Sequence, residues 1–248
     1  MLDDLQYRIL RKISPGVPPA TVDGASYEGR PKLGVLLGDD FLKMIQGKTV
    51  IDFGCGEGAE ALDIARHGAK KVIGLDIRPQ ALERARGRAV AAGLDDRCEF
   101  ATSTNTKAEV ILSLDAFEHF ADPAAILDIM HSLLDPNGCV IVSFGPTWYH
   151  PLGGHLFSVF PWAHLIFSEP ALLRWRADLR NDGAKRFSEV DGGLNQITIA
   201  RFERLVAASK FRVDTLETVS IRALRSVHNR LTREFTTAVV RTRLVPRA

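Results

Sequence analysis

The chain has 248 residues, of which 46% are hydrophobic and 25% charged, and its formal net charge is +2. This composition is ordinary for one globular domain with an elaboration, and it excludes disorder and low complexity. Three scattered cysteines, Cys55, Cys98 and Cys139, and the lack of a signal-peptide pattern at the N-terminus predict reduced thiols, no disulfide framework, no metal site and a cytoplasmic location.

Short apolar strands alternate with helices in the first part of the chain. Asp122 is a candidate N-cap for the third of these helices, and the DPNG stretch predicts a turn before the fifth strand. The alternation predicts an α/β fold with a doubly wound, mostly parallel sheet, whose ligand lies beyond the carboxyl ends of the strands. Predicted strands cover residues 48–53, 70–77, 97–102, 108–115 and 138–144, and predicted helices cover 60–69, 78–93 and 122–134.

The rest of the chain elaborates this pattern within a single domain, 1–248. Residues 1–47 are expected to form a helical extension, and residues 145–198 an insertion after the fifth strand that caps the substrate. The C-terminal part predicts a helix over 197–209 and two strands, 211–223 and 234–245, which pair antiparallel at one edge around an Arg-rich connection. From Ala171 onwards there are 16 Lys and Arg against 8 Asp and Glu, which indicates solvated helix faces or a surface for an anionic partner.

The stretch VIDFGCGEGAE, residues 50–60, fits two kinds of cofactor loop. Its glycines allow positive φ and a close approach of the backbone to a ligand at a helix N-terminus, whether the ligand is a dinucleotide or S-adenosylmethionine. Asp52 favours the second, because a carboxylate repels a pyrophosphate and attracts a sulfonium and an ammonium. Asp76 follows the next strand and suits the ribose hydroxyls of either cofactor. The polar SLDAFEHF stretch after the fourth strand also speaks against a nicotinamide site.

Four stretches, VIDFGCGEG, VIGLDI, VILSLDAFEHFADP and LLDPNGCVIVSF, occur in this order between Lys48 and Phe144. Together they resemble the ordered motifs of class I S-adenosylmethionine-dependent methyltransferases, and more loosely the bacterial small-molecule and saccharide enzymes among them. The resemblance implies a Rossmann-like sheet of seven strands with the last strand antiparallel. It also implies S-adenosyl-L-methionine as the cofactor.

By position, the resemblance implies a set of cofactor contacts. Asp52 would set the glycine loop and approach the methionine end of the cofactor. Asp76 would bind the ribose hydroxyls, and Ile77 would pack on the adenine. Leu114 and Asp115 would lie beneath the methionine and near the transferring methyl group.

The glycine loop and the third strand carry further implied contacts. Many relatives place an acid after the third strand to contact the adenine amine, whereas this chain offers Thr102 or Ser103, which leaves that contact open. Gly58 serves either the cofactor or helix–strand packing alone, and Cys55 is read as a small residue in a tight turn, not as a nucleophile. The loop residues implied to line the amino-acid part of the cofactor are Gly54, Cys55, Gly56 and Gly58.

Histidines are the candidates for acid–base chemistry. His119 follows the fourth strand and is a candidate general base, a cofactor or substrate contact, or a structural residue. The uncharged insertion contributes His150 and His155, which flank PLGG, as further catalytic candidates. A metal site made of these histidines is disfavoured because the uncharged segment contains no carboxylate.

The acceptor is predicted only by class. Aromatic residues of the insertion form either the core of a cap or an apolar wall for a sugar, an aromatic ring or a lipid tail. We expect a small-molecule or saccharide acceptor methylated at oxygen, and rank contact with a membrane surface lower. No nucleic-acid motif is present. An NAD-linked oxidoreductase and a non-catalytic cofactor-binding scaffold are the alternative functions, and the oligomeric state is not predicted.

Overall fold

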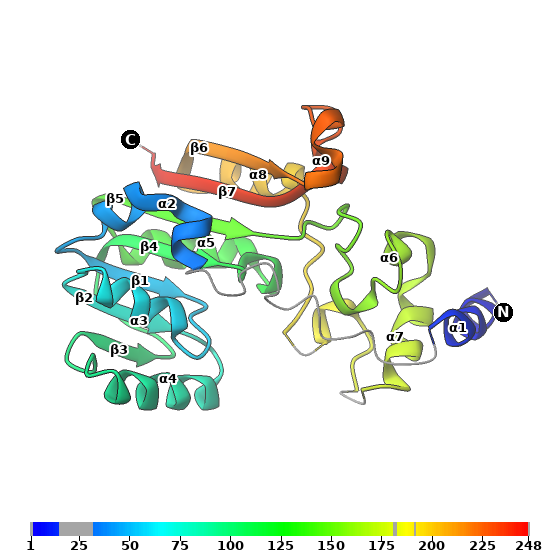
Figure 1. Ribbon diagram of the computed structural model, residues 1–248, viewed down its shortest axis with the longest axis horizontal. Coiled ribbons are helices and arrows are strands. Elements are labelled where there is room, and N and C mark those ends of the chain that lie inside the picture. The colour runs from blue at the N-terminus through cyan, green and yellow to red at the C-terminus, as the bar shows by residue number, and fades with distance from the viewer. Residues whose placement is uncertain (1, 15–31, 181–182, 191, 248) are drawn as a thin grey trace.

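The computed structural model describes residues 2–14, 32–180, 183–190 and 192–247, so residues 15–31 of the expected N-terminal extension lie outside the described part (Figure 1). The described residues form one sheet of seven strands in the order β3-β2-β1-β4-β5-β7-β6. The strands are β1 (Thr49–Phe53), β2 (Lys71–Leu75), β3 (Cys98–Ala101), β4 (Ala108–Leu114), β5 (Leu134–Phe144), β6 (Phe211–Ser220) and β7 (Thr237–Pro246).

The sheet is parallel from β3 to β5 and antiparallel from β5 to β6. The predicted doubly wound sheet with an antiparallel last strand is therefore confirmed. The two C-terminal strands pair with each other as expected, with β7 inserted between β5 and the edge strand β6. The central strands are buried on both faces, which is why they read as continuous apolar runs in the sequence.

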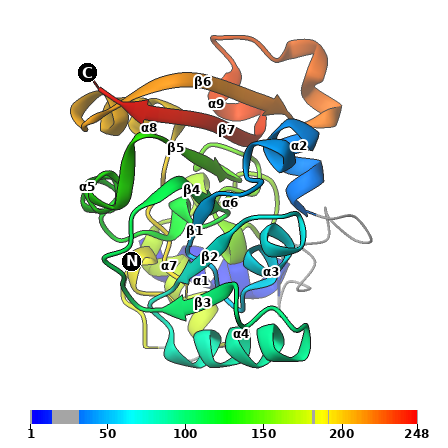
Figure 2. The same cartoon turned by 90° about the vertical axis from the view of Figure 1, so that its left-hand side faces the viewer.

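Helices cover both faces of the sheet, as right-handed crossovers require (Figure 2). One apolar core lies between the sheet and α2, α3 and α4, and the other lies between the sheet and α5 and α8. The described helices are α1 (Leu2–Ile13), α2 (Lys32–Met44), α3 (Ala59–Arg66), α4 (Pro79–Ala91), α5 (Pro123–Leu133), α6 (Ala163–Ile166), α7 (Glu169–Ala177), α8 (Ile199–Ala208) and α9 (Arg233–Thr236).

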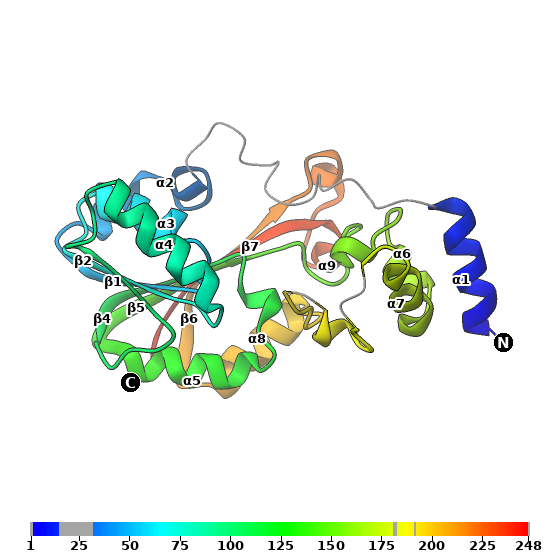
Figure 3. The ribbon, with the colours of Figure 1, turned by 90° about the horizontal axis from the view of Figure 1, so that it is seen from below.

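The described residues between 145 and 198 form a separate layer beyond the carboxyl ends of β4 and β5 (Figures 1 and 3). This layer has an apolar core of its own, in which Phe157 and Trp175 are buried. Helix α1 packs against α7: the Tyr7 hydroxyl donates to Asp178 over 2.8 Å, and the Trp175 indole N–H donates to the Ser14 carbonyl over 2.9 Å. The N-terminal helix therefore belongs structurally to the inserted layer.

The fifth strand differs from its prediction. It begins at Leu134 and not at Gly138, so the DPNG stretch predicted as a turn lies within the strand at a shift of register against β4. Leu134 pairs with Ala108, which returns the chain to the sheet before Pro136 and Asn137 bulge outwards. A side chain at Gly138 would meet the Glu109 carbonyl at 2.7 Å, so the close approach of two strands explains this glycine.

Asp122 caps α5 as the sequence predicts, and its carboxylate accepts hydrogen bonds from the Ala124 and Ala125 N–H groups, both over 3.1 Å. We expect Asp122→Ala to lower the free energy of unfolding by about 1 kcal/mol, the usual worth of an N-cap. Urea unfolding measures this change. Asp122→Asn keeps an acceptor oxygen and should lose much less, so equal losses in the two variants would contradict a capping role.

Candidate functional site

Three carboxylates gather at one edge of the sheet. Asp52 lies in β1, Asp76 follows β2 and Asp115 follows β4, and these three strands are parallel neighbours. The register pairs Asp52 with Gly74 on one side and with Leu112 on the other, so the carboxyl ends of the strands meet. The fold thus brings together residues that are distant in the sequence, at the edge where open α/β sheets bind ligands.

The glycine loop after β1 is a tight turn whose three glycines all have positive φ, of 87° at Gly54, 53° at Gly56 and 79° at Gly58. A Cβ atom at Gly54 would lie 2.7 Å from the Ala116 side chain, and one at Gly58 would lie 2.8 Å from Phe100. Both positions are therefore closed by packing. At Gly56 the nearest atom would be the end of the Arg78 side chain at 3.4 Å, so this position is the most open of the three towards a ligand.

Cys55 turns its side chain into the protein. The residue is buried, and its sulfur lies where a Cβ atom on Gly74 would approach to 2.9 Å. Burial, together with the nearby carboxylates, raises the pKa of the thiol far above its ordinary value. The thiol is therefore not activated as a nucleophile, and the loop backbone is the part of Cys55 available to a ligand.

Asp52 carries a buried carboxyl group with an unused oxygen. Its side-chain atom Oδ2 has no hydrogen-bond partner among the described residues. Burial raises the pKa of Asp52 to about 8, and the charges of Glu60 and Asp76 add to the rise. A buried carboxylate with one unpaired oxygen is costly once ionised. A cation bound beside Asp52 would remove that cost.

Lys32 supplies a cation to the same edge from the start of α2. Its Nζ lies 2.9 Å from an Asp115 carboxylate oxygen and 3.2 Å from a Glu60 oxygen. Burial opposes the charge of Lys32, but the two carboxylates outweigh it and raise the pKa of the lysine. The sequence indicated neither Lys32 nor Glu60 as site residues, since only the packing of α2 and α3 on the sheet brings them together.

Asp76 organises the loop from the second strand. One carboxylate oxygen accepts the Gly56 N–H over 2.9 Å, and the other accepts the backbone N–H of Arg78 over 2.9 Å. The Arg78 guanidinium also donates to both oxygens, over 3.0 and 3.1 Å. Burial alone would raise the pKa of Asp76, but these donors outweigh it and lower the pKa. Arg78 is a further residue of this site that sequence reasoning missed.

Ile77 and Ser103 complete the ends of β2 and β3. Ile77 follows Asp76 directly and leaves 89% of its surface exposed. Ser103 is also exposed, after β3. An apolar side chain this exposed beside a buried carboxylate offers a flat, aromatic ligand a surface to cover.

His119 is held in one tautomer by the inserted layer. It ends the short 3₁₀ helix η2 (Phe117–His119), and its Nδ1 lies 2.8 Å from the Gly193 carbonyl oxygen. A carbonyl can only accept, so Nδ1 carries the proton and, in the neutral ring, Nε2 keeps its lone pair. Gly193 has φ 68°, and a Cβ atom there would lie 2.9 Å from the His119 carbonyl.

Asn195 fastens the same turn. Its amide nitrogen Nδ2 donates to the carbonyls of Phe117 and Phe120 over 2.8 and 2.9 Å, and its backbone N–H donates to the Glu118 carbonyl over 3.0 Å. Residues 193–195 of the insertion therefore clamp η2 from both ends. The sequence contained no signal for Gly193 or Asn195, because the contact spans more than seventy positions.

The other two candidate histidines lie in the inserted layer. The ring of His155 packs against that of His119, with centroids 5.4 Å apart. His150 uses its Nδ1 to accept the Leu152 N–H over 2.9 Å, so its neutral ring carries the proton on Nε2. Burial lowers the pKa of both His150 and His155 to about 4, and neighbouring histidines add to this effect. Both rings are neutral at pH 7, and His150 is a hydrogen-bond donor.

Glu118 is a second buried acid, on the turn that carries His119. It is 2% exposed, its Oε1 accepts the Gly145 N–H over 3.3 Å, and its Oε2 has no hydrogen-bond partner among the described residues. Burial raises the pKa of Glu118 to about 8, and the charge of Asp115 adds to the rise. At neutral pH Glu118 is largely protonated, so it can donate a hydrogen bond beside the ends of β4 and β5.

These features fit S-adenosylmethionine. The orphaned oxygen of Asp52 suits the cationic methionine end, the Asp76 carboxylate suits vicinal hydroxyls, and exposed Ile77 suits a purine ring. A family model described as a methyltransferase domain matches residues 36–215. The chain belongs to this methyltransferase family. It is a class I S-adenosylmethionine-dependent methyltransferase domain, which confirms the predicted family and cofactor and excludes the alternative of an NAD-linked oxidoreductase.

The curated relatives cover only part of the chain. Ribosomal protein L11 methyltransferase from Vibrio campbellii is 40% identical over 100 residues, which are 40% of this chain and 34% of that protein. Ubiquinone biosynthesis O-methyltransferase from Neisseria meningitidis is 36% identical over 106 residues, 40% of this chain and 44% of that protein. The matched part thus spans about a third to under a half of each relative, and the two relatives differ in their acceptors.

A solved structure supports the fold over nearly the whole chain. Magnesium protoporphyrin IX methyltransferase from Synechocystis PCC 6803, solved with bound S-adenosylhomocysteine, superposes with a TM-score of 0.56. The match is 18% identical and covers 99% of this chain and 96% of that one. At this level of identity the likeness concerns the fold.

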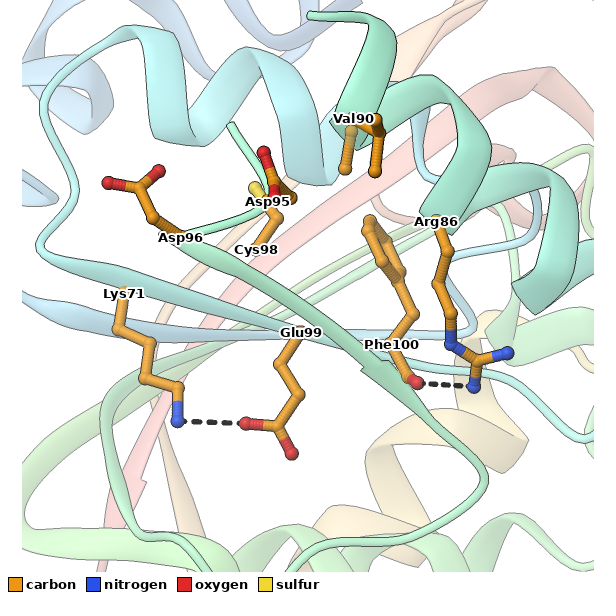
Figure 4. Close-up of a pocket in the computed structure, with 9 residues that line it drawn as sticks. Lys71, Arg86, Val90, Asp95, Asp96, Cys98, Glu99 and Phe100 are labelled. Atoms are coloured by element: carbon orange, nitrogen blue, oxygen red, sulfur yellow. Dashed lines mark hydrogen bonds and ion pairs between the residues drawn. The ribbon is translucent and has the colours of Figure 1, made fainter. Parts of the chain in front are cut away.

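The depression between β3 and α4 is separate from the site (Figure 4). Its lining contains none of the candidate residues. Two of its cations are bound locally, Lys71 by the ion pair with Glu99 at 2.8 Å and Arg86 by its bond to the Phe100 carbonyl. In the described residues, no group of three or more His, Cys, Asp or Glu side chains is placed to hold a metal ion. Among the helices described, none has the length and apolar character needed to cross a membrane.

The two buried acids predict how stability depends on pH without cofactor. Asp52 and Glu118 have a pKa of about 8 in the folded protein and ordinary values near 4 when unfolded, so the folded state holds the protons more tightly. The free energy of unfolding should therefore fall as pH rises from about 4 to about 8, by up to about 1.4 kcal/mol per pH unit for each acid. Urea unfolding between these limits measures the slope.

The variants Asp52→Asn and Glu118→Gln isolate each contribution. Each should flatten the dependence of the free energy of unfolding on pH. Asp128→Asn, at an exposed position of α5, should leave that dependence unchanged. Parallel slopes in wild type and both buried-acid variants would contradict the raised pKa values.

Proposed function

We propose that the chain transfers a methyl group from S-adenosylmethionine to a hydroxyl oxygen of a small-molecule or glycan-like acceptor, with His119 as general base. The observation that carries the proposal is the tautomer of His119. The proton on Nδ1 is donated to the Gly193 carbonyl, so the Nε2 lone pair is available beside the end of β4. A hydroxyl acceptor must lose a proton during methylation, and a positioned histidine is suited to take it.

Each residue has a role in the proposed mechanism. Bound S-adenosylmethionine supplies a methyl group activated by its sulfonium. Asp52 would neutralise the cationic end of the cofactor, while Asp76 would hold the ribose and Ile77 would cover the adenine. The glycine loop would position the amino-acid part through its backbone, as the site residues Gly54, Cys55, Gly56 and Gly58 imply, with Leu114 and Asp115 below the methionine.

The proton has a defined route. His119 Nε2 would accept the hydroxyl proton while the acceptor oxygen bonds to the methyl carbon and the carbon–sulfur bond of the sulfonium breaks. The resulting imidazolium would keep its Nδ1–H bond to the Gly193 carbonyl. The ring then returns the proton to solvent. His150 would orient the acceptor through its Nε2–H, and neutral His155 would pack beside His119 without competing for the proton.

Residues 145–198 are proposed to cap the acceptor. They lie beyond the carboxyl ends of β4 and β5, and they contribute Gly193 to the His119 contact. A cap made from this layer would exclude water from the reaction, which strengthens every electrostatic interaction in the site. We also propose a cytoplasmic location, supported by three cysteines that are buried and free of disulfides.

Cofactor binding tests the placement of Asp76. Asp76→Ala should weaken the binding of S-adenosylhomocysteine by about 1–3 kcal/mol, because the ribose hydroxyls and the Gly56 N–H lose their acceptor. Calorimetric titration measures the affinity, and NADH serves as the ligand that should not bind. Glu99→Ala, which changes an exposed acid on β3, is the matched control. Unchanged affinity in Asp76→Ala would refute the assignment.

Turnover tests the base. An acceptor screen with isotopically labelled S-adenosylmethionine, run over phenols, hydroxylated small molecules and oligosaccharides, identifies a substrate by transfer of the label. With that substrate, His119→Ala should lower kcat by roughly 10²–10⁴-fold and leave the affinity for S-adenosylhomocysteine unchanged. His131→Ala on α5 is the matched control. Cofactor binding without transfer to any acceptor would favour the alternative of a non-catalytic scaffold.

A further inference from the structure

The connection between β6 and β7, residues 221–236, forms a strongly basic projection that we call the basic tip. It contains the 3₁₀ helix η5 (Arg222–Val227) and α9. No acid occurs between Glu217 and Glu234, whereas Arg222, Arg225 and Arg230 are exposed. The carboxylate of Glu234 is turned towards the start of α8, where it accepts the backbone N–H groups of Ile199 and Ala200, and the three exposed arginines outnumber it.

Apolar side chains stand among these arginines. Leu231 leaves 92% of its surface exposed, Val227 51% and Phe235 45%. These three exposed apolar side chains belong to one short connection, which also carries the exposed arginines, and we call them the apolar patch. Exposed apolar residues grouped in this way differ from those scattered singly over a protein surface. The patch therefore combines apolar surface with positive charge.

The basic tip is held in a defined shape. The ring of His228 bridges two threonines, with Nδ1 2.7 Å from Thr236 Oγ1 and Nε2 3.1 Å from Thr218 Oγ1. The Thr232 hydroxyl donates to the Val227 carbonyl over 2.6 Å, and the Leu231 N–H donates to the Asn229 side chain over 2.8 Å. These bonds present Leu231 and the arginines on a structured support.

The topology puts the basic tip beside the inserted layer. Because β7 runs antiparallel to β5, its first residues lie at the edge of the sheet where β5 ends. Phe235 stacks on Tyr149 of the insertion, with ring centroids 5.2 Å apart. Figure 1 shows the tip projecting near α6, on the side of the molecule that carries the proposed cap.

We propose that the basic tip docks the protein on the surface of an anionic lipid bilayer. The arginines contact the headgroups, and Leu231 and Val227 enter the interface between headgroups and acyl chains. Basic residues beside exposed apolar side chains are the combination that peripheral membrane contacts use. Because the tip contacts the inserted layer through Phe235 and Tyr149, docking through the tip would bring that layer near the bilayer.

The composition of the patch favours lipid over nucleic acid. Proteins that bind single-stranded nucleic acid stack bases on exposed aromatic rings, but the most exposed apolar residues here are aliphatic, and Phe235 is already stacked on Tyr149. Leu231 and Val227 would have no role against a phosphate backbone. This inference concerns a surface outside the cofactor site, so it can be tested independently of methyl transfer.

Vesicle sedimentation with the full chain tests the proposal. We expect binding to vesicles of phosphatidylcholine mixed with phosphatidylglycerol, little binding to phosphatidylcholine alone, and weaker binding at raised salt. Replacing Arg222, Arg225 and Arg230 by Gln should weaken the partition coefficient by about fivefold per arginine. Leu231→Ser should weaken it by roughly tenfold at unchanged charge.

Matched variants control for charge and for surface apolarity. Lys43→Gln, Lys70→Gln and Lys107→Gln together remove the same charge from exposed positions away from the tip, and Ile129→Ser removes an exposed aliphatic side chain from α5. Both controls should bind vesicles like wild type, and circular dichroism checks that every variant is folded. Equal losses in tip and control variants would overturn the proposal, as would tip-dependent binding to RNA with none to anionic vesicles. S-adenosylhomocysteine affinity should stay the same in all of them.

Discussion

The crowding of carboxyl groups at the carboxyl ends of β1, β2 and β4 is the constraint on which the rest of the site depends. Asp52 is buried with one oxygen lacking a partner, and the charges of Glu60 and Asp76 raise its pKa further. Lys32 brings a cation to Asp115 and Glu60, and Arg78 brings one to Asp76. An edge with this charge distribution favours a cationic ligand and disfavours a pyrophosphate, which is the physical basis for its cofactor preference.

The inserted layer and the catalytic edge are joined through one short turn. The 3₁₀ helix η2 carries Glu118 and His119, and it is fastened by Gly193 and Asn195 from the far end of the insertion. Displacing this segment would remove the acceptor of the His119 Nδ1 proton and so release the ring. The contacts of Gly193 and Asn195 therefore link the position of the proposed cap to the tautomer of the proposed base. This link does not require a cofactor to be bound at the strand ends.

The antiparallel strands add a second elaboration at the same edge. Inserting β7 between β5 and β6 carries the connection of these strands to the carboxyl edge, where Phe235 stacks on Tyr149. The proposed cofactor site thus lies among β1, β2 and β4, while the other half of the sheet carries the surfaces that we propose to meet an acceptor. A fold can carry different functions on different sites, so the sheet alone does not identify the acceptor.

The sequence alone determined the sheet, the cofactor loop and the family, because these depend on local patterns. Buried strands appear in the sequence as apolar runs. The N-cap at Asp122 and the glycine loop each depend on a few neighbouring residues, and Asp52 and Asp76 lie at the ends of adjacent strands. Only the tertiary structure decided what depends on contacts between distant residues. Lys32 reaches Asp115 from α2, Arg78 turns back onto Asp76, and Gly193 selects the His119 tautomer across 74 positions. Such pairs produce no periodic pattern or motif in the sequence, because the partner of each residue depends on how the helices and strands pack together.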